Sequence, residues 1–279
     1  MGNQSAIRYF GGKGVIYKEI IGFFPPKNSY LTYIEPFGGA ASILFQKERS
    51  PIEIYNDLEQ NVYSLFKVLS DKKLFREFKE KCDLSYYSAQ LRKEYKEDLK
   101  KDLSLIERAY KYFYVNRTSV NGVGGFGCSV EFIRRNMSKS VSDFLSSVDR
   151  LYDIHNRLSS VIIDNRDAIE LIKKYDRKKV FFYLDPPYHQ STRTTARYAQ
   201  DMSDDDQDKL IDALINIKHA DVLLSGYDCK LYDSLCKNGW EKIDFNVKTQ
   251  DGNRNSKTKT ESLWRNYKST GDQVTIMEI

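Results

Sequence analysis

A short segment that begins at Asp185 carries the residues best suited to chemistry in this chain. Asp185 is followed by Pro186, Pro187 and Tyr188, and the five residues before it are apolar and strongly β-prone. Such a run without polar alternation predicts a strand that is buried on both faces. The prolines end the strand because they have no N–H to donate. Ligands of open α/β sheets bind at the carboxyl ends of the strands, so Asp185 is expected beside a ligand.

These four residues suit a planar ligand that carries an amino group. Asp185 and the carbonyl of Pro186 would accept its two N–H bonds, and Tyr188 would stack on the ring. A plain exit from strand to loop is the alternative, because Asp and Pro are common in turns. The other motifs of the chain decide between the two interpretations.

A glycine-containing turn is the second candidate. Residues 30–35 predict a strand that ends in Glu35, and residues 41–48 have a helical pattern. A strand, a glycine turn and a helix in this order are typical of Rossmann-like nucleotide sites. The G-x-G-x-x-G spacing is missing, which favours a mononucleoside ligand over a dinucleotide. The turn consists of Pro36, Phe37, Gly38, Gly39 and Ala40.

Two charged residues extend this candidate site. Asp57 ends a predicted strand over residues 52–57, where an acidic group is placed to bind ribose hydroxyls. Alternatively, Asp57 is the N-cap of the helix that follows. Lys13 comes after two glycines in residues 7–14, a loop that would close over an anionic or carboxylate-bearing ligand. A simple turn is the alternative for this loop.

The block from residue 72 to residue 150 is basic. It contains 17 Lys and Arg and 11 Asp and Glu, whereas the whole chain has a net charge of only +5. Helical patterns cover residues 74–84, 105–115 and 140–158, and the Gly/Asn-rich residues 116–129 predict a β-hairpin or an open loop. Tyr and Phe are interleaved with the basic residues, which favours nucleic-acid recognition. A solvated helical subdomain is the alternative.

The alternation of strands and helices resumes after this block. Strands are predicted over residues 161–165, 180–185 and 221–227, with helices that begin after Asp167 and after Ser203 as N-cap. Residues 240–250 and 258–267 predict an antiparallel pair, and residues 189–202 a polar loop. We therefore expect an α/β fold with a Rossmann-like sheet in residues 1–71 and 151–279. The inserted block, 72–150, is expected to be mainly helical and to carry the hairpin or loop.

Several classes of protein are disfavoured by the composition. The four cysteines lack C-x-x-C spacing and the three histidines are scattered, so we expect free thiols and no metal site. No stretch of about 18 apolar residues is present, and the start of the chain lacks an apolar signal region. These features predict a cytoplasmic protein.

Taken together, the motifs resemble the DNA adenine-N6 methyltransferases that use S-adenosylmethionine and carry their motifs in the Dam-like order. RYFGGKG (8–14) looks like their N-terminal motif, and EPFGGAAS (35–42) like their methionine-side motif. DPPY (185–188) looks like the catalytic motif, and ESLWRNY (261–267) like the closing strand. NRTSVNG (116–122) is similar to the start of the recognition hairpin. The family usually has Arg or Lys soon after this Asn-Gly, where the present chain has Gly-Val-Gly-Gly-Phe-Gly-Cys.

The resemblance implies roles for particular residues. The flipped adenine would be bound by the catalytic residues Asp185, Pro186, Pro187 and Tyr188. The cofactor would be bound by Tyr9, Phe10, Lys13, Glu35, Pro36, Phe37, Gly38, Gly39, Ala40, Asp57, Asp167, Ala168 and Asp185. Duplex DNA would be contacted by Arg117, Ser119, Asn121 and Arg134, and by Arg193 and Arg197 of the polar loop.

The function that follows is methylation of adenine N6 in duplex DNA, with the base flipped out of the helix. The resemblance implies a bacterial or phage-encoded monomer, with a cognate restriction endonuclease as a further candidate partner. Cytosine-N4 methylation is a rival, because that exocyclic amine poses the same chemical problem; Asp before Pro-Pro-Tyr favours adenine. Methylation of protein glutamine and a non-catalytic DNA-binding role are two further candidate functions.

Overall fold

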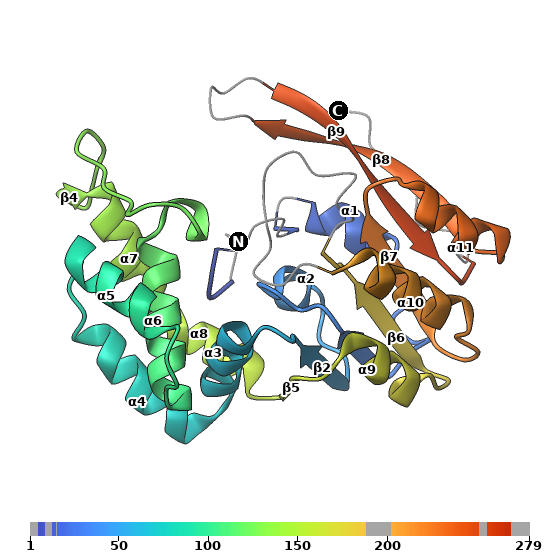
Figure 1. Ribbon diagram of the computed structural model, residues 1–279, viewed down its shortest axis with the longest axis horizontal. Coiled ribbons are helices and arrows are strands. Elements are labelled where there is room, and N and C mark those ends of the chain that lie inside the picture. Colours follow the sequence, from blue (N-terminus) through green and yellow to red (C-terminus); the bar gives the residue numbers. More distant parts are fainter. Residues whose placement is uncertain (1–4, 9–12, 15, 188–201, 251–255, 269–279) are drawn as a thin grey trace. The chain divides into compact units, whose positions relative to one another are not determined.

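The computed structural model describes residues 5–8, 13–14, 16–187, 202–250 and 256–268 (Figure 1). The chain forms two compact units. One consists of Met1–Gly14, Gly39–Lys47 and Asp57–Asn165, and will be called the helical unit. The other consists of Val15–Gly38, Glu48–Asn56 and Arg166–Ile279, and will be called the sheet unit.

The sheet unit is built on parallel strands. Its strands β1 (Thr32–Glu35), β2 (Ile52–Asn56), β6 (Val180–Leu184) and β7 (Asp221–Gly226) run parallel, and β8 (Glu241–Gln250) and β9 (Ser256–Arg265) form an antiparallel pair next to β7. Within this unit the strand order is β2-β1-β6-β7-β9-β8, and β5 (Val161–Asp164) belongs to the helical unit. The order reverses between β1 and β6, and such switch points are where open α/β sheets bind ligands.

Strand β6 is buried on both faces, as its unbroken apolar sequence predicts. Phe182 and Leu184 belong to a core cluster that includes residues of helices α9 (Ala168–Tyr175), α10 (Asp204–Ile215) and α11 (Asp233–Lys237). On the other face, the ring of Phe181 contacts Phe24 at 4.7 Å between centroids and Tyr30 at 5.1 Å. Helix α1 (Tyr17–Gly22) precedes Phe24. Burial of both faces fixes the strand that leads into Asp185.

Local capping signals set the helix starts in this unit. Ser203 forms a capping box with Asp206 at the start of α10, which confirms the predicted N-cap. Asp167 caps α9 by accepting the backbone N–H groups of Ile169 and Glu170. A 3₁₀ turn, Lys230–Tyr232, leads into α11. The predicted antiparallel pair of strands near the carboxyl end is also confirmed.

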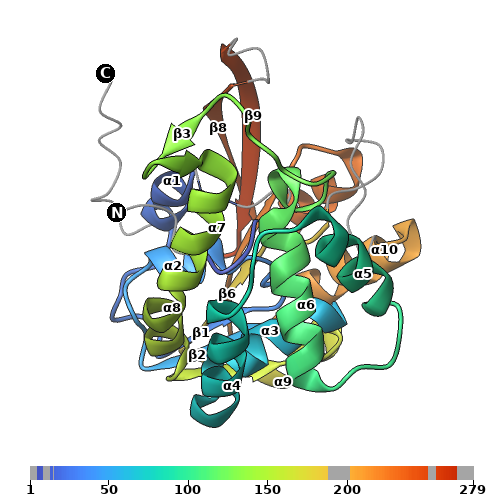
Figure 2. The ribbon, with the colours of Figure 1, turned by 90° about the vertical axis from the view of Figure 1, so that its left-hand side faces the viewer.

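The helical unit packs around helix α6 (Figures 1 and 2), which contacts α3, α4, α5 and α7. Phe113 of α6 meets Phe78 edge to face at 5.6 Å, and Tyr114 meets Phe144 at 5.5 Å. The remaining short elements are a 3₁₀ turn, Val120–Gly122, and the hairpin strands β3 (Ile133–Arg134) and β4 (Met137–Ser138). The helices are α2 (Ser42–Gln46), α3 (Gln60–Ser70), α4 (Lys72–Asp83), α5 (Ala89–Asp98), α6 (Leu105–Thr118), α7 (Lys139–Asp149) and α8 (Leu151–Leu158).

Two features of this unit differ from the sequence-based expectation, and a third agrees with it. The helix expected over 140–158 is two helices, α7 and α8, that meet at Arg150. Helix α5 was not predicted, because it buries no residue and so lacks an apolar stripe. The open loop, one of the two forms predicted over residues 116–129, is found over residues 119–129, with a single β-bridge between Ser119 and Phe126. A separate hairpin, β3–β4, follows it.

No helix within the described ranges has the length and apolarity needed to cross a membrane. All four cysteines are free. The described residues also contain no cluster of potential metal ligands. The 72–150 block lies inside the helical unit, and its role as a separate recognition domain stays a prediction.

Candidate active site

Two acidic residues stand at the carboxyl ends of neighbouring parallel strands in the sheet unit. Ile34 of β1 lies opposite Phe182 of β6, so Glu35 and Asp185 follow at the same edge of the sheet. They therefore flank the point where the strand order reverses. Glu35 is buried and accepts a hydrogen bond of 2.7 Å from the hydroxyl of Tyr33. Burial, together with the charge of Glu35, raises the pKa of Tyr33 well above its ordinary value.

Asp185 is half-buried and is held by the neighbouring strand. The hydroxyl of Ser225, on β7, donates to Oδ1 of Asp185 at 2.9 Å, with the Leu184 carbonyl 3.2 Å away. The Ser225 hydroxyl is also 3.1 Å from the hydroxyl of Tyr183. A carboxylate can only accept hydrogen bonds, so the single hydroxyl proton of Ser225 is donated to Asp185. The hydroxyl of Tyr183 therefore donates its hydrogen bond to the oxygen of Ser225. The sequence reasoning missed Ser225, because nothing in the sequence links it to a residue 40 positions away.

The second proline after Asp185 is held by helix α10. Pro186 is buried, and the carbonyl of Pro187 accepts a hydrogen bond of 2.6 Å from Nε2 of Gln207. Gln207 is itself buried, and its Oε1 lies 3.4 Å from the hydroxyl of Tyr232. Gln207 is a second contact of this segment that the sequence alone did not indicate. The other residue predicted to be catalytic, Tyr188, lies outside the described ranges, as do Tyr9, Phe10, Arg193 and Arg197.

The first half of the glycine turn is shaped by β2. Gly38 donates its N–H to the carbonyl of Asn56 at 2.8 Å. A Cβ on Gly38 would lie only 2.1 Å from the ring of Tyr55, so no side chain fits here. The Asn56 amide donates to the carbonyls of Pro36 at 2.8 Å and Arg166 at 3.0 Å. Asn56 thus ties the turn to the segment that precedes α9. Phe37, in the same turn, packs against the core cluster.

The second half of the turn belongs to the helical unit and is held by Asp57. Oδ2 of Asp57 accepts the N–H of Gly39 at 2.7 Å, and Oδ1 accepts the N–H of Glu59 at 2.8 Å. Burial raises the pKa of Asp57 to about 6, although these two hydrogen bonds act in the opposite direction. The alternative interpretation, Asp57 as the N-cap of α3, is wrong. Glu59 is that cap, and its carboxylate accepts the N–H groups of Asn61 and Val62.

Four further residues predicted to hold the cofactor have these positions. Lys13 is buried in the helical unit, with 5% of its surface exposed. Asp167 uses its carboxylate to cap α9, and Ala168 is buried in the first turn of that helix. Ala40, which ends the glycine turn, is buried. Their roles toward a cofactor stay predictions.

Of the residues predicted to contact DNA, two are buried and two are exposed among those that the structure describes. Arg117 is buried; its Nε donates to the carbonyl of Ala6 at 2.7 Å and one terminal nitrogen to that of Ser5 at 2.6 Å. Burial lowers the pKa of Arg117 to about 9.

Ser119 is also buried and accepts a hydrogen bond of 3.0 Å from Arg92. Asn121 is exposed at the tip of the 3₁₀ turn, with a left-handed φ of 52°. Arg134 is exposed on the hairpin.

The fold and the site together define a class of enzyme. A mostly parallel sheet with an acidic, proline-stopped strand end at its switch point is the framework of a Rossmann-like methyltransferase. The chain belongs to the D12 class N6 adenine-specific DNA methyltransferase family, whose model matches residues 9–255. The comparison with curated proteins found no match.

Membership of this family settles the reaction. The chain is an enzyme that methylates the N6 amino group of adenine in DNA. Family membership thereby excludes the three other functions that the sequence had left open: cytosine-N4 methylation, glutamine methylation and a non-catalytic role.

Proposed function

We propose that the chain binds S-adenosylmethionine at the carboxyl ends of β1 and β6 and that Asp185 directs the amino group of a flipped adenine in duplex DNA. The observation that carries this proposal is the pair Glu35 and Asp185 at the switch point of the sheet, with Asp185 held by the buried Ser225. Bound S-adenosylmethionine supplies an electrophilic methyl group.

The donor set fits this cofactor. S-adenosylmethionine carries an ammonium and a sulfonium, both cationic, and a sheet edge with two carboxylates attracts positive charge. Asp57 is proposed to accept hydrogen bonds from the ribose hydroxyls. A carboxylate has about four lone-pair sites. Asp57 accepts hydrogen bonds from two backbone N–H groups, so it can still accept hydrogen bonds from a ligand. The other proposed cofactor residues are Tyr9, Phe10, Lys13, Pro36, Phe37, Gly38, Gly39, Ala40, Asp167 and Ala168.

The proposed role of Asp185 follows from the electronic structure of the substrate. The amino nitrogen of adenine is a poor nucleophile because its lone pair is delocalised into the ring. Asp185 and the Pro186 carbonyl accept its two N–H bonds and turn the nitrogen toward tetrahedral geometry, which localises the lone pair. The same acceptors stabilise the positive charge that develops on nitrogen. Tyr188 is proposed to stack on the base, a contact worth roughly 1–3 kcal/mol.

We propose that the 72–150 block makes most of the DNA contacts, because it holds the basic excess of the chain. The base leaves the duplex before it reaches Asp185, since its amino group is buried in the stack. We further propose a monomer that acts in the cytoplasm of a bacterium or phage host, with a restriction endonuclease of the same target site as its partner.

The test compares Asp185→Ala with wild-type protein. We expect turnover to be abolished while binding of S-adenosylmethionine, measured by calorimetry, largely survives. Asp221→Asn, at the amino end of the adjacent strand β7, is the matched control and should leave turnover unchanged. Ser225→Ala should lower kcat by roughly 10- to 100-fold through misplacement of the carboxylate, and Ser225→Thr should restore much of it. Full turnover in Asp185→Ala, measured as N6-methyladenine by mass spectrometry of digested DNA, would refute the role of Asp185.

A further inference from the structure

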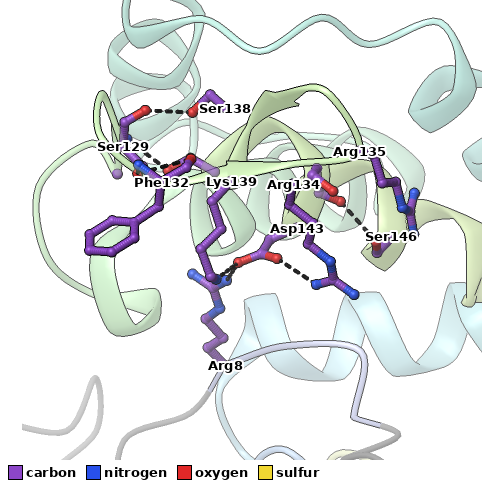
Figure 3. Close-up of polar contacts among 12 residues, drawn as sticks. Arg8, Ser129, Phe132, Arg134, Arg135, Ser138, Lys139, Asp143 and Ser146 are labelled. Carbon is purple, nitrogen blue, oxygen red and sulfur yellow. Dashed lines mark hydrogen bonds and ion pairs between the residues drawn. The ribbon is translucent and has the colours of Figure 1, made fainter.

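The β3–β4 hairpin and the first turns of α7 gather three basic side chains around one carboxylate (Figure 3). Oδ1 of Asp143 accepts a hydrogen bond of 3.0 Å from Arg134, and Oδ2 forms an ion pair with Lys139. The guanidinium of Arg8 lies 4.0 Å from the same Oδ2. The three cations come from separate parts of the chain: the amino-terminal segment, strand β3 and helix α7.

Arg8 is placed in this cluster by the end of helix α6. Its backbone N–H donates to Oδ1 of Asn116 at 2.8 Å, and its carbonyl accepts the Asn116 amide at 2.8 Å. The Arg8 guanidinium donates to the carbonyl of Ser119 at 3.3 Å. A Cβ on Gly122 would lie 2.4 Å from the Arg8 carbonyl, so only glycine fits against it. These contacts hold Arg8 through its backbone as well as its side chain.

The cluster has more positive charge than Asp143 neutralises. Three cations face one carboxylate, which leaves an excess of two positive charges. The side chains of Arg8, Arg134 and Lys139 are 39%, 55% and 51% exposed, whereas that of Asp143 is 18% exposed. Burial acts to raise the pKa of Asp143, but the hydrogen bond and charge of Lys139 and the hydrogen bond from Arg134 lower it overall. Asp143 is therefore an ionised group at the base of an exposed basic cluster.

The hairpin beside this cluster has features that stability alone does not explain. Phe132 is 61% exposed and Ile133 is 77% exposed, so apolar surface faces solvent next to the basic groups. The hairpin turn places Arg135 and Asn136 at φ values of 53° and 57°. Turns with two left-handed residues favour Asn and Gly, and Arg in that conformation is strained. Strain together with exposed apolar surface is typical of an interaction surface.

We propose that Arg8, Arg134 and Lys139 bind a phosphodiester group of the DNA substrate, and that Asp143 occupies this site as an internal substitute for the phosphate until DNA binds. This inference rests on the proposed contact of the 72–150 block with DNA and extends it to Arg8. A DNA phosphate carries the same single negative charge as a carboxylate and releases condensed counterions when cations bind it. Asp143 competes with the phosphate and so weakens binding to every DNA sequence.

The test is binding of a fluorescent duplex, followed by anisotropy across a salt series, with Asp143→Asn as the main variant. Removing the competing charge should tighten binding by about two- to fivefold, the range set by exposed ion pairs. Asp98→Asn is the matched control. Asp98 also pairs with two lysines, Lys101 at 2.7 Å and Lys111 at 2.8 Å, and its side chain is 24% exposed. The Asp98→Asn variant shows how much DNA binding changes when the net charge of the protein changes by one unit.

Two further variants test the cations. Arg134→Ala and Lys139→Ala should each weaken binding to all sequences and reduce the slope of log K against log salt by about one. Thermal unfolding of each variant separates a misfolded hairpin from a lost contact. If Asp143→Asn binds no more tightly than Asp98→Asn, the substitute role is refuted. If Arg134→Ala and Lys139→Ala keep the wild-type slope, no phosphate binds here.

These outcomes are distinct from failure of the proposed function. If the cluster variants behave as wild type while neutralisation of other basic residues in the 72–150 block weakens binding, only this inference fails. If no neutralisation in the block weakens binding, the proposed DNA contact of the block fails with it. The role of Asp185 is tested by measuring N6-methyladenine formation, and that test depends on neither of these binding results.

Discussion

Replacement of Asp57 by Asn tests the electrostatics of the glycine turn. Burial raises the pKa of Asp57 from 3.8 to about 6, and each unit is worth about 1.36 kcal/mol. The folded state therefore favours the protonated carboxyl by about 3 kcal/mol. Because the folded pKa lies above the unfolded one, this contribution is fully present below about pH 3.8 and is lost as pH rises through 6.

The Asp57→Asn variant lacks this contribution at every pH. The difference in unfolding free energy, variant minus wild type, should therefore rise by about 2–3 kcal/mol between about pH 4 and pH 7.5. A constant loss of about 1–3 kcal/mol is superimposed, because the Asn amide cannot accept from both Gly39 and Glu59. Urea unfolding at the two pH values separates the two effects, since only the first depends on pH.

Asp71→Asn is the matched control with the opposite sign. Asp71 is the half-buried N-cap of α4, and hydrogen bonds from the N–H groups of Leu74 and Lys73 lower its pKa. Its contribution is present above its unfolded pKa and is lost as pH falls. Asp71→Asn should therefore be most destabilising at neutral pH, with a deficit that shrinks in acid.

The same Asp57 variant tests binding of the cofactor. If Asp57 accepts ribose hydroxyls, Asp57→Asn should weaken S-adenosylmethionine binding at about pH 7.5 by roughly 10- to 100-fold. A stability difference that does not change with pH would refute the raised pKa. An unchanged affinity in a folded variant would leave Asp57 with only the structural task of holding the glycine turn.

Two other substitutions address packing. Gly38→Ala should destabilise the protein by about 1–3 kcal/mol, because the new Cβ would overlap the fully buried ring of Tyr55. The control is Gly22→Ala, where nothing lies within 4 Å of the new Cβ, and it should change stability by less than about 1 kcal/mol. Equal effects of the two substitutions in urea unfolding would contradict the overlap. Arg117→Ala should cost about 2–4 kcal/mol through its two lost buried hydrogen bonds, whereas Lys93→Ala, an exposed change in the same unit, should stay within about 0.5 kcal/mol. If Arg117→Ala keeps wild-type stability but alters discrimination between DNA sites, the readout role predicted from the sequence is the better one.

Several elements could be predicted because their signals are local. The unbroken apolar run 180–184 is a strand buried on both faces, and the prolines after it set its end. Ser203 followed by acidic residues marked the start of α10. The order of the motifs was also sufficient to recognise the family. Helix α5 shows the limit of this approach, because a helix that buries no residue leaves no periodic signal in the sequence.

The environment of a charged side chain cannot be predicted from its local sequence. Arg117 and Arg134 lie in the same basic block of the sequence, yet Arg117 is buried against two backbone carbonyls and Arg134 is exposed on a hairpin. The sequence around each arginine does not distinguish the two cases, because burial of a side chain depends on segments that are far away in the chain.

The types of residue at the strand ends, and their order along the chain, can be read from the sequence. Which of these residues come into contact depends on the folded chain. Ser225 reaches Asp185 because β7 lies beside β6, and Arg8 reaches Asp143 because the end of helix α6 holds its backbone. Local propensity and periodicity act over a few residues, whereas these contacts join residues 40 and more positions apart and form only when the whole chain has folded.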